Sequence, residues 1–111
     1  MEIFQWMQRD GTEPNMVTWT ALIRAYGKNG FPDKAFQLFQ EMQQLGITPT
    51  VITWNSIIDA YGSQGDSEKA SELFQCMQHK EIFPNVVTYN AMIYAHGKRE
   101  RNRMKLLSLP F

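Results

Sequence analysis

The sequence has little of several features that mark whole classes of protein. Cys76 is the only cysteine in 111 residues, so no intrachain disulfide can form and nothing indicates an oxidising compartment. No apolar run approaches the roughly 18 residues that span a bilayer, so we expect that the chain is not an integral membrane protein. Eleven Lys and Arg residues balance eleven Asp and Glu residues, which excludes the strongly basic class of nucleic-acid binder.

What remains is enough for one small folded domain. The chain is 43% hydrophobic and 13% aromatic, so it can bury a core and does not resemble a disordered segment. Its first residues have neither a basic segment followed by an apolar one nor the Arg-rich and Ser-rich amphipathic character of an organellar presequence. No targeting segment is visible in the chain.

The chain repeats itself with a period of 35 residues. Residues 16–50 and 51–85 are identical at 16 of 35 positions. A third copy begins at Val86, and residues 1–15 match the second half of a unit. We therefore expect a half unit at 1–15, whole units at 16–50 and 51–85, the start of a unit at 86–100, and a basic degenerate tail at 101–111. Because the pattern begins and ends within a unit, we favour a truncated member of a longer repeat protein.

Each unit has two stretches with the apolar spacing of an amphipathic helix. In the first whole unit these positions are Trp19, Leu22, Ile23, Tyr26 and then Ala35, Leu38, Phe39, Met42. Glycines at 30, 46 and 65 suit the left-handed residue after a helix, Pro32 suits a first helical turn, and Asp66 suits an N-cap. One such hairpin cannot cover both of its apolar faces, so the sequence predicts an all-α fold, an α-solenoid of stacked helix-turn-helix hairpins.

Two consequences of this fold concern the core and the ends. The aromatic residues at the same register position, Trp19, Trp54 and Tyr89, are predicted to pack in the core rather than to stack on bases, and His96 is predicted to be a core or interface residue. The opening segment carries Ile3, Phe4 and Met7, which would face a first helix that this sequence lacks. We therefore expect a sticky N-terminal end and some self-association.

The unit resembles a known repeat. It reads Val-Thr-Trp/Tyr-Asn-x-x-Ile-x-Ala-Tyr-Gly, then Lys-Ala-x-x-Leu-Phe-Gln-x-Met, then Gly/Glu-Ile-x-Pro. This pattern resembles the pentatricopeptide repeat, in its plain 35-residue type, over about residues 1–98. The tetratricopeptide repeat shares the spacing of Trp19, Leu22 and Tyr26, but it has a 34-residue period and a glycine where this chain has Ile23.

The resemblance implies a reader of single-stranded RNA that takes one base per repeat, in organellar RNA processing, stability or translation, mostly in mitochondria or chloroplasts. In this family the fifth and last residues of a unit select the base. These positions are Thr20 with Thr50, Asn55 with Asn85, and the half-pairs Asn15 and Asn90. Val17, Ile52 and Val87 would clamp the bases, and Lys28 and Lys98 would contact phosphates, although Ser63 replaces this lysine in the middle unit. By the family's pattern the pair Asn55 and Asn85 prefers a pyrimidine, whereas the pair Thr20 and Thr50 does not indicate which base is bound.

Other functions fit the sequence less well. Thr20 and Asn55 could be ordinary solvated side chains, but the register places them at specific positions. Cys76 and His79 could touch one metal ion, yet two ligands do not make a site, so we expect neither a metal nor another cofactor. With His79 and His96 as the only histidines, no catalytic constellation is supported, and we expect that the chain is not an enzyme.

The distribution of charge supports an alternative. Residues 1–97 carry six basic and ten acidic side chains, and the positive charge gathers between Lys98 and Lys105. An acidic repeat body should bind RNA weakly in physiological salt. A protein-interaction solenoid in the manner of tetratricopeptide repeats, whose partner is a peptide or another repeat protein, therefore remains open, as does a truncated fragment that does not bind RNA by itself.

Overall fold

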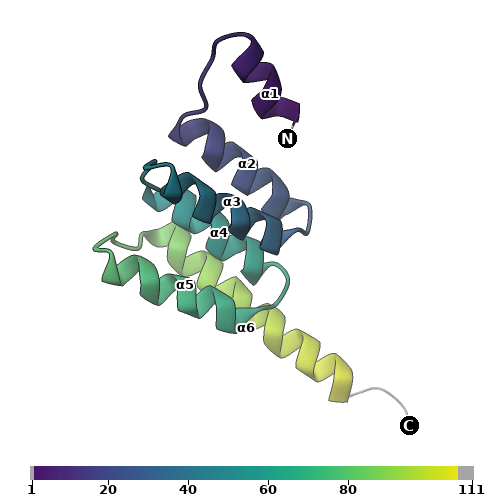
Figure 1. Ribbon diagram of the computed structural model, residues 1–111. Helices are drawn as coiled ribbons and strands as arrows, with labels where there is room; N and C mark the ends of the chain where they lie inside the picture. Colours follow the sequence, from purple (N-terminus) through teal and green to yellow (C-terminus); the bar gives the residue numbers. More distant parts are fainter. Residues whose placement is uncertain (1, 108–111) are drawn as a thin grey trace.

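The computed structural model describes residues 2–107, and these form α-helices joined by short loops without any strand. The helices are α1 (Glu2–Arg9), α2 (Met16–Lys28), α3 (Pro32–Gln44), α4 (Val51–Gly62), α5 (Ser67–His79) and α6 (Val86–Leu107). They follow one another as stacked antiparallel hairpins, with α1 set apart at one end (Figure 1). The predicted all-α solenoid is confirmed. None of the described helices is both long and apolar enough to cross a membrane.

The helix ends follow local signals in the sequence. Gly30, Gly46 and Gly65 have left-handed φ values of 84°, 81° and 79°, as predicted for residues that follow a helix. Pro32 occupies the first turn of α3, and the Asp66 carboxylate accepts a hydrogen bond from the Lys69 backbone N–H at the start of α5. Short loops of this kind force successive helices to run antiparallel.

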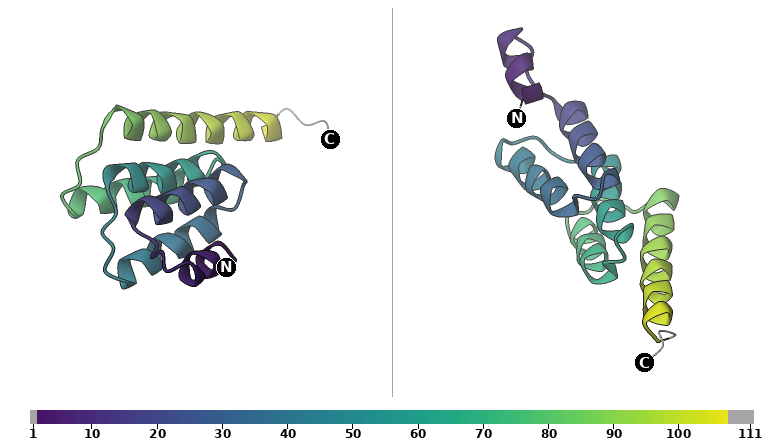
Figure 2. Two further views of the ribbon diagram at one scale, coloured as in Figure 1. Left: turned by 90° about the horizontal axis from the view of Figure 1, so that it is seen from above. Right: turned by 90° about the vertical axis from the view of Figure 1, so that its right-hand side faces the viewer.

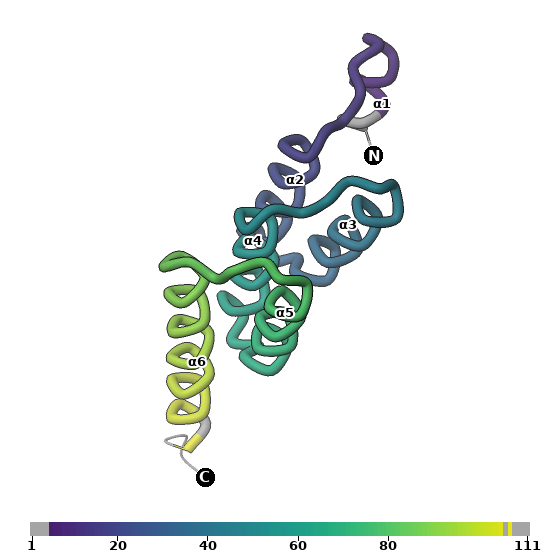
Figure 3. The backbone as a smooth tube through the Cα atoms, turned by 90° about the vertical axis from the view of Figure 1, so that its left-hand side faces the viewer, coloured from purple at the N-terminus to yellow at the C-terminus, as the bar shows by residue number. Residues whose placement is uncertain are grey.

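The helices form two layers. The first helices of successive units, α2, α4 and α6, stack side by side, and α3 and α5 both lie on the same side of this stack (Figure 3). Between the layers, Trp54 of α4 is 1% exposed and meets the Phe39 ring of α3 edge to face, with 4.7 Å between the ring centres. The core therefore lies between the layers and leaves the opposite side of α2, α4 and α6 open.

Polar contacts tie one unit to the next at the edge of this core. The Tyr61 hydroxyl of α4 donates a 2.9 Å hydrogen bond to the Asp33 carboxylate of α3. Burial and the neighbouring Asp33 carboxylate raise the pKa of Tyr61 above its ordinary value, so the phenol stays protonated and remains a donor. Lys69 Nζ of α5 lies 4.1 Å from the centre of the Phe36 ring, which adds a cation–π contact between units.

The last helix departs from the pattern of the others. α6 runs without a break from Val86 to Leu107, past residue 100 where the repeat pattern ends, and its far end projects beyond the stack (Figure 2). The prediction that Tyr89 is a buried core residue is wrong. Its ring meets Phe74 of α5 edge to face, with 5.7 Å between the ring centres, but no described helix covers its other side. His96, predicted to lie in the core or at an interface, is exposed. Tyr89 is 49% exposed, whereas its register mates Trp19 and Trp54 are 4% and 1% exposed. The expectation for Ile3 and Phe4 falls on side chains outside the described residues.

Glycines let the first helices of neighbouring units approach closely. A Cβ atom at Gly27 would lie 2.8 Å from the Cβ of Ala60, and one at Gly62 would lie 3.0 Å from the Cβ of Ala95. Gly97 occupies the same register position in α6, but a Cβ atom there would meet no described atom within 4 Å. Glycine at this register position is thus required by close packing at Gly27 and Gly62, whereas at Gly97 the described structure leaves space for a side chain.

This contrast gives a prediction about stability. Gly27→Ala should lower the free energy of unfolding by about 1–3 kcal/mol, because neither alanine can move away from the overlap. Gly97→Ala should raise it by up to about 1 kcal/mol, because alanine favours a helix over glycine. Urea unfolding followed by circular dichroism measures both, and equal stability of the two variants would contradict the packing described here.

A second prediction concerns the turn after α5. Glu81 stands in register with Gly46 and adopts a left-handed φ of 61°, which is strained for a residue with a side chain. Glu81→Gly should therefore stabilise the fold by about 1 kcal/mol, and Gly46→Glu should destabilise it by a similar amount. Thermal unfolding of the two variants should move the midpoint in opposite directions, and shifts of the same sign would be inconsistent with this strain.

Candidate nucleic-acid interface

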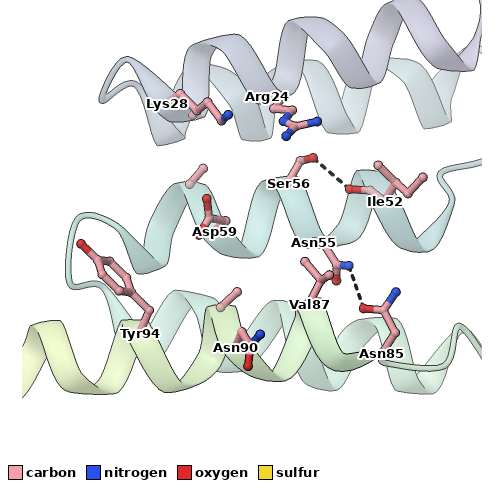
Figure 4. A pocket seen from close by; sticks show the side chains of 13 residues that line it. Arg24, Lys28, Ile52, Asn55, Ser56, Asp59, Asn85, Val87, Asn90 and Tyr94 are labelled. Carbon is pink, nitrogen blue, oxygen red and sulfur yellow. Dashed lines mark hydrogen bonds between the residues drawn. The ribbon is translucent and has the colours of Figure 1, made fainter.

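The open side of α2, α4 and α6 carries two grooves, and we call this surface the groove face. The first groove, of about 600 Å³, lies between α2 and α4. The second, of about 540 Å³, continues between α4 and α6 (Figure 4). No described residue of α3 or α5 lines either groove. Val17, Ile52 and Val87 stand at the groove walls, and they are 66%, 59% and 56% exposed although they are aliphatic.

The second groove contains a joined pair of asparagines. Asn55 Nδ2 donates a 3.1 Å hydrogen bond to Asn85 Oδ1, across 30 residues of sequence. The Thr88 hydroxyl donates to Asn55 Oδ1, so each side-chain oxygen of the pair already accepts a hydrogen bond within the protein. In Figure 4 the Nδ2 atom of Asn85 points away from this bond. The asparagine pair therefore presents N–H donors to the groove, between the aliphatic walls Ile52 and Val87.

The first groove contains a different arrangement of its pair. Thr20 is only 8% exposed, and its Oγ1 lies 2.8 Å from Oγ1 of Thr53. Thr50 meets the same residue, since its backbone N–H donates a 3.2 Å hydrogen bond to Thr53 Oγ1. Thr20 and Thr50 are thus brought together through Thr53, and the Thr20 hydroxyl points into the helix interface more than into the groove. This pair offers less directional hydrogen bonding than the asparagines.

The two half-pairs differ in position. Asn15 is the N-cap of α2, where its Oδ1 accepts a 3.1 Å hydrogen bond from the backbone N–H of Thr18. Asn90 is exposed on α6 and lines the second groove. Only Asn90 of the two lies on a described groove.

The charged residues of the groove face include two that the sequence analysis did not single out. Of the two lysines predicted to contact phosphates, Lys28 lines both grooves and Lys98 lines neither. Arg24 lines both grooves, and Asp59 lines the second. Arg24 lies one helical turn after Thr20 and one turn before Lys28, so the i, i+4, i+8 spacing along α2 is the signal that could have identified it.

The described residues show no arrangement suited to metal binding. No three side chains of the types His, Cys, Asp and Glu gather closely enough within residues 2–107 to hold an ion. Cys76 and His79 are both exposed on α5, away from the grooves. The chemical features of the groove face are hydrogen-bond donors, aliphatic walls and a few charges.

Two models of pentatricopeptide repeat families match the chain. The model described as the pentatricopeptide repeat domain matches residues 2–64, which is more than half of the chain. A second model, the PPR repeat family, matches residues 49–98. Among curated proteins, none matches the chain.

Solved structures of repeat proteins are similar over most of the chain. The pentatricopeptide repeat protein PPR10 from maize is 31% identical over 95% of this chain, with a TM-score of 0.78. PPR10 in complex with an 18-nucleotide psaJ RNA element is 28% identical over 92%, with a TM-score of 0.81. The PPR domain of Arabidopsis thaliana protein-only RNase P 1, in complex with tRNA, is 23% identical over 99% of this chain and 61% of that one, with a TM-score of 0.72, and is similar in fold. The chain spans about 15% of the length of PPR10.

Proposed function

The chain belongs to the pentatricopeptide repeat family, and we propose that its groove face binds single-stranded RNA with selection of the base, one base per repeat unit. The observation that carries this proposal is the Asn55–Asn85 pair between the exposed aliphatic walls Ile52 and Val87. Aliphatic side chains on both sides can hold a flat base, and amide groups at the bottom of the groove can read its edge. The structure of PPR10 in complex with an RNA element supports RNA as the type of ligand.

The donors of the asparagine pair favour one kind of base. With both side-chain oxygens occupied, the pair offers N–H groups to a ligand. Cytosine presents two adjacent acceptors, N3 and O2, on its Watson–Crick edge. Uracil has an N3–H donor between its two acceptors and would leave one N–H facing another. The pair should therefore prefer cytosine over uracil, and a pyrimidine over a larger purine.

Binding by this chain should be weak but measurable. Stacking and clamping contribute about 1–3 kcal/mol per base, and ordering the strand opposes association. Among the described residues, only Arg24 and Lys28 bring positive charge to the grooves, while Asp59 brings negative charge. We expect micromolar affinity at low salt, with the asparagine pair supplying most of the base preference.

The first functional prediction exchanges a donor for an acceptor. Asn85→Asp should move the preference from cytosine towards uracil, because one carboxylate oxygen replaces the outward amide N–H and can accept from uracil N3–H. Fluorescence anisotropy with short RNAs that differ at one position measures the ratio of the two dissociation constants. Gln78→Glu, on the exposed surface of α5, adds the same charge away from the grooves and should leave the ratio unchanged.

Base-independent binding that disappears when Lys98, Arg99, Arg101, Arg103 and Lys105 are neutralised would overturn the proposal. Such a result would place any RNA affinity in the basic end of α6. Absence of RNA binding, together with binding to a peptide or another repeat protein, would support the protein-interaction alternative instead.

The second functional prediction tests the charges of the groove face. Arg24→Gln should weaken RNA binding and lower the salt dependence by about 0.7 in the slope of log affinity against log salt, the value for one phosphate contact on a single strand. Asp59→Asn should strengthen binding by about two- to fivefold at low salt, because it removes a repelling charge. Glu41→Gln on α3 removes one negative charge, as Asp59→Asn does, and is its control. An equal effect of Glu41→Gln on RNA binding would point to net charge rather than to the grooves.

A further inference from the structure

A buried threonine lies beneath the asparagine pair and belongs to the next unit. Thr88 is 0% exposed, and its hydroxyl group is in contact with both partners of the pair. Its oxygen accepts a 3.0 Å hydrogen bond from the Asn85 backbone N–H and its hydrogen is donated to Asn55 Oδ1. Oγ1 of Thr88 also lies 3.1 Å from Asn85 Oδ1. The single hydroxyl thus joins the cap of α6 to the side chain of α4 that faces the groove.

These contacts determine the orientation of the Asn55 amide. In the observed orientation, Asn55 accepts from Thr88 and donates to Asn85 Oδ1. Rotation of the amide by 180° would place the Asn55 oxygen against the Asn85 oxygen, so the Asn55–Asn85 hydrogen bond would be replaced by a contact between two acceptors. A hydroxyl donor at position 88 therefore keeps the Asn55 N–H groups towards Asn85 and the groove.

The same arrangement occurs in the first groove with different side chains. Thr53 is also 0% exposed, and its hydroxyl lies 2.8 Å from that of Thr20 and accepts a hydrogen bond from the Thr50 backbone N–H. The pair changes from asparagines to threonines, whereas the residue beneath it stays threonine. Thr18, in register with both, caps α2 with Asn15 and contacts no fifth-position side chain of a preceding unit within the described part of the chain.

We propose that Thr88, and by the same geometry Thr53, is a positioning residue that sets the base preference of the preceding unit by holding its fifth-position side chain in one orientation. This inference rests on the proposed RNA binding for its functional consequence, while the orientation itself is independent of any ligand. The threonine acts through Asn55 and is not expected to touch the base. Selectivity of a unit would thus depend on a residue of the next unit that lies outside the groove.

The test compares three variants of the full chain. Thr88→Val keeps the shape and removes the hydroxyl, Thr88→Ser keeps the hydroxyl, and Thr18→Val removes the equivalent capping group where no pair lies above it. With RNAs that carry cytosine or uracil at one position, Thr88→Val should reduce the preference for cytosine by about fivefold, the effect of one hydrogen bond. Thr88→Ser and Thr18→Val should retain the wild-type ratio even if their overall affinity falls. A wild-type ratio in folded Thr88→Val would overturn the inference.

Side-chain amide signals in NMR test the orientation without RNA. The Asn55 amide protons should exchange with water about fivefold faster in Thr88→Val than in the wild type, and at the wild-type rate in Thr88→Ser and Thr18→Val. Unchanged exchange in Thr88→Val would overturn the inference whether or not RNA binds. If the wild type binds no RNA while the exchange rates change as expected, the proposed function fails and the positioning role of Thr88 stands.

Discussion

The close approach of α2, α4 and α6 is the constraint on which the rest of the structure depends. Gly27 faces Ala60 near the C-terminal ends of α2 and α4, and Gly62 at the end of α4 faces Ala95 in the middle of α6. At these points the backbones are so close that no larger side chain fits between them. Toward the N-terminal ends, the hydroxyls of Thr53 and Thr88 connect neighbouring units. Because both contacts recur with the repeat, they fix the distance between successive grooves. The same helix contacts that pack the solenoid therefore also set the spacing of its grooves.

The sequence predicted those parts of the fold that depend on local chemistry. Gly30 and Gly65 end their helices because a left-handed residue is a local requirement, and Trp54 is buried because its apolar neighbours recur at helical spacing. Tyr89 has the same spacing as Trp54 but remains half exposed. Its ring meets Phe74 of α5, but full burial would require a further helix on its other side, and register within a repeat does not reveal whether such a neighbour is present.

The candidate site was predictable in position but not in bonding. The resemblance to the pentatricopeptide repeat paired Asn55 with Asn85, and they are joined by a hydrogen bond. It did not predict that Thr20 is buried against Thr53, because that contact depends on which atoms face each other across the helix interface. Comparison of the units draws attention to residues that recur at one register position and away from residues that occur once. Arg24 was missed because aspartate and tyrosine occupy its position in the next two units.

The two grooves offer different chemistry to one strand. In the first, the Thr20 hydroxyl is withdrawn into the helix interface, and the groove presents Val17 and Ile52 as aliphatic walls beside the positive charges of Arg24 and Lys28. In the second, which Arg24 and Lys28 also line, oriented N–H donors are exposed and Asp59 offsets part of the positive charge. Phosphate contacts fix the position of a nucleic acid, whereas contacts with base edges discriminate between sequences. In the proposed function, the first groove therefore contributes affinity with little selection, and the second adds selection while the Asp59 charge weakens its attraction for phosphate. The proposed binding needs both grooves, since discrimination at Asn55 and Asn85 has an effect only while neighbouring contacts hold the strand in place.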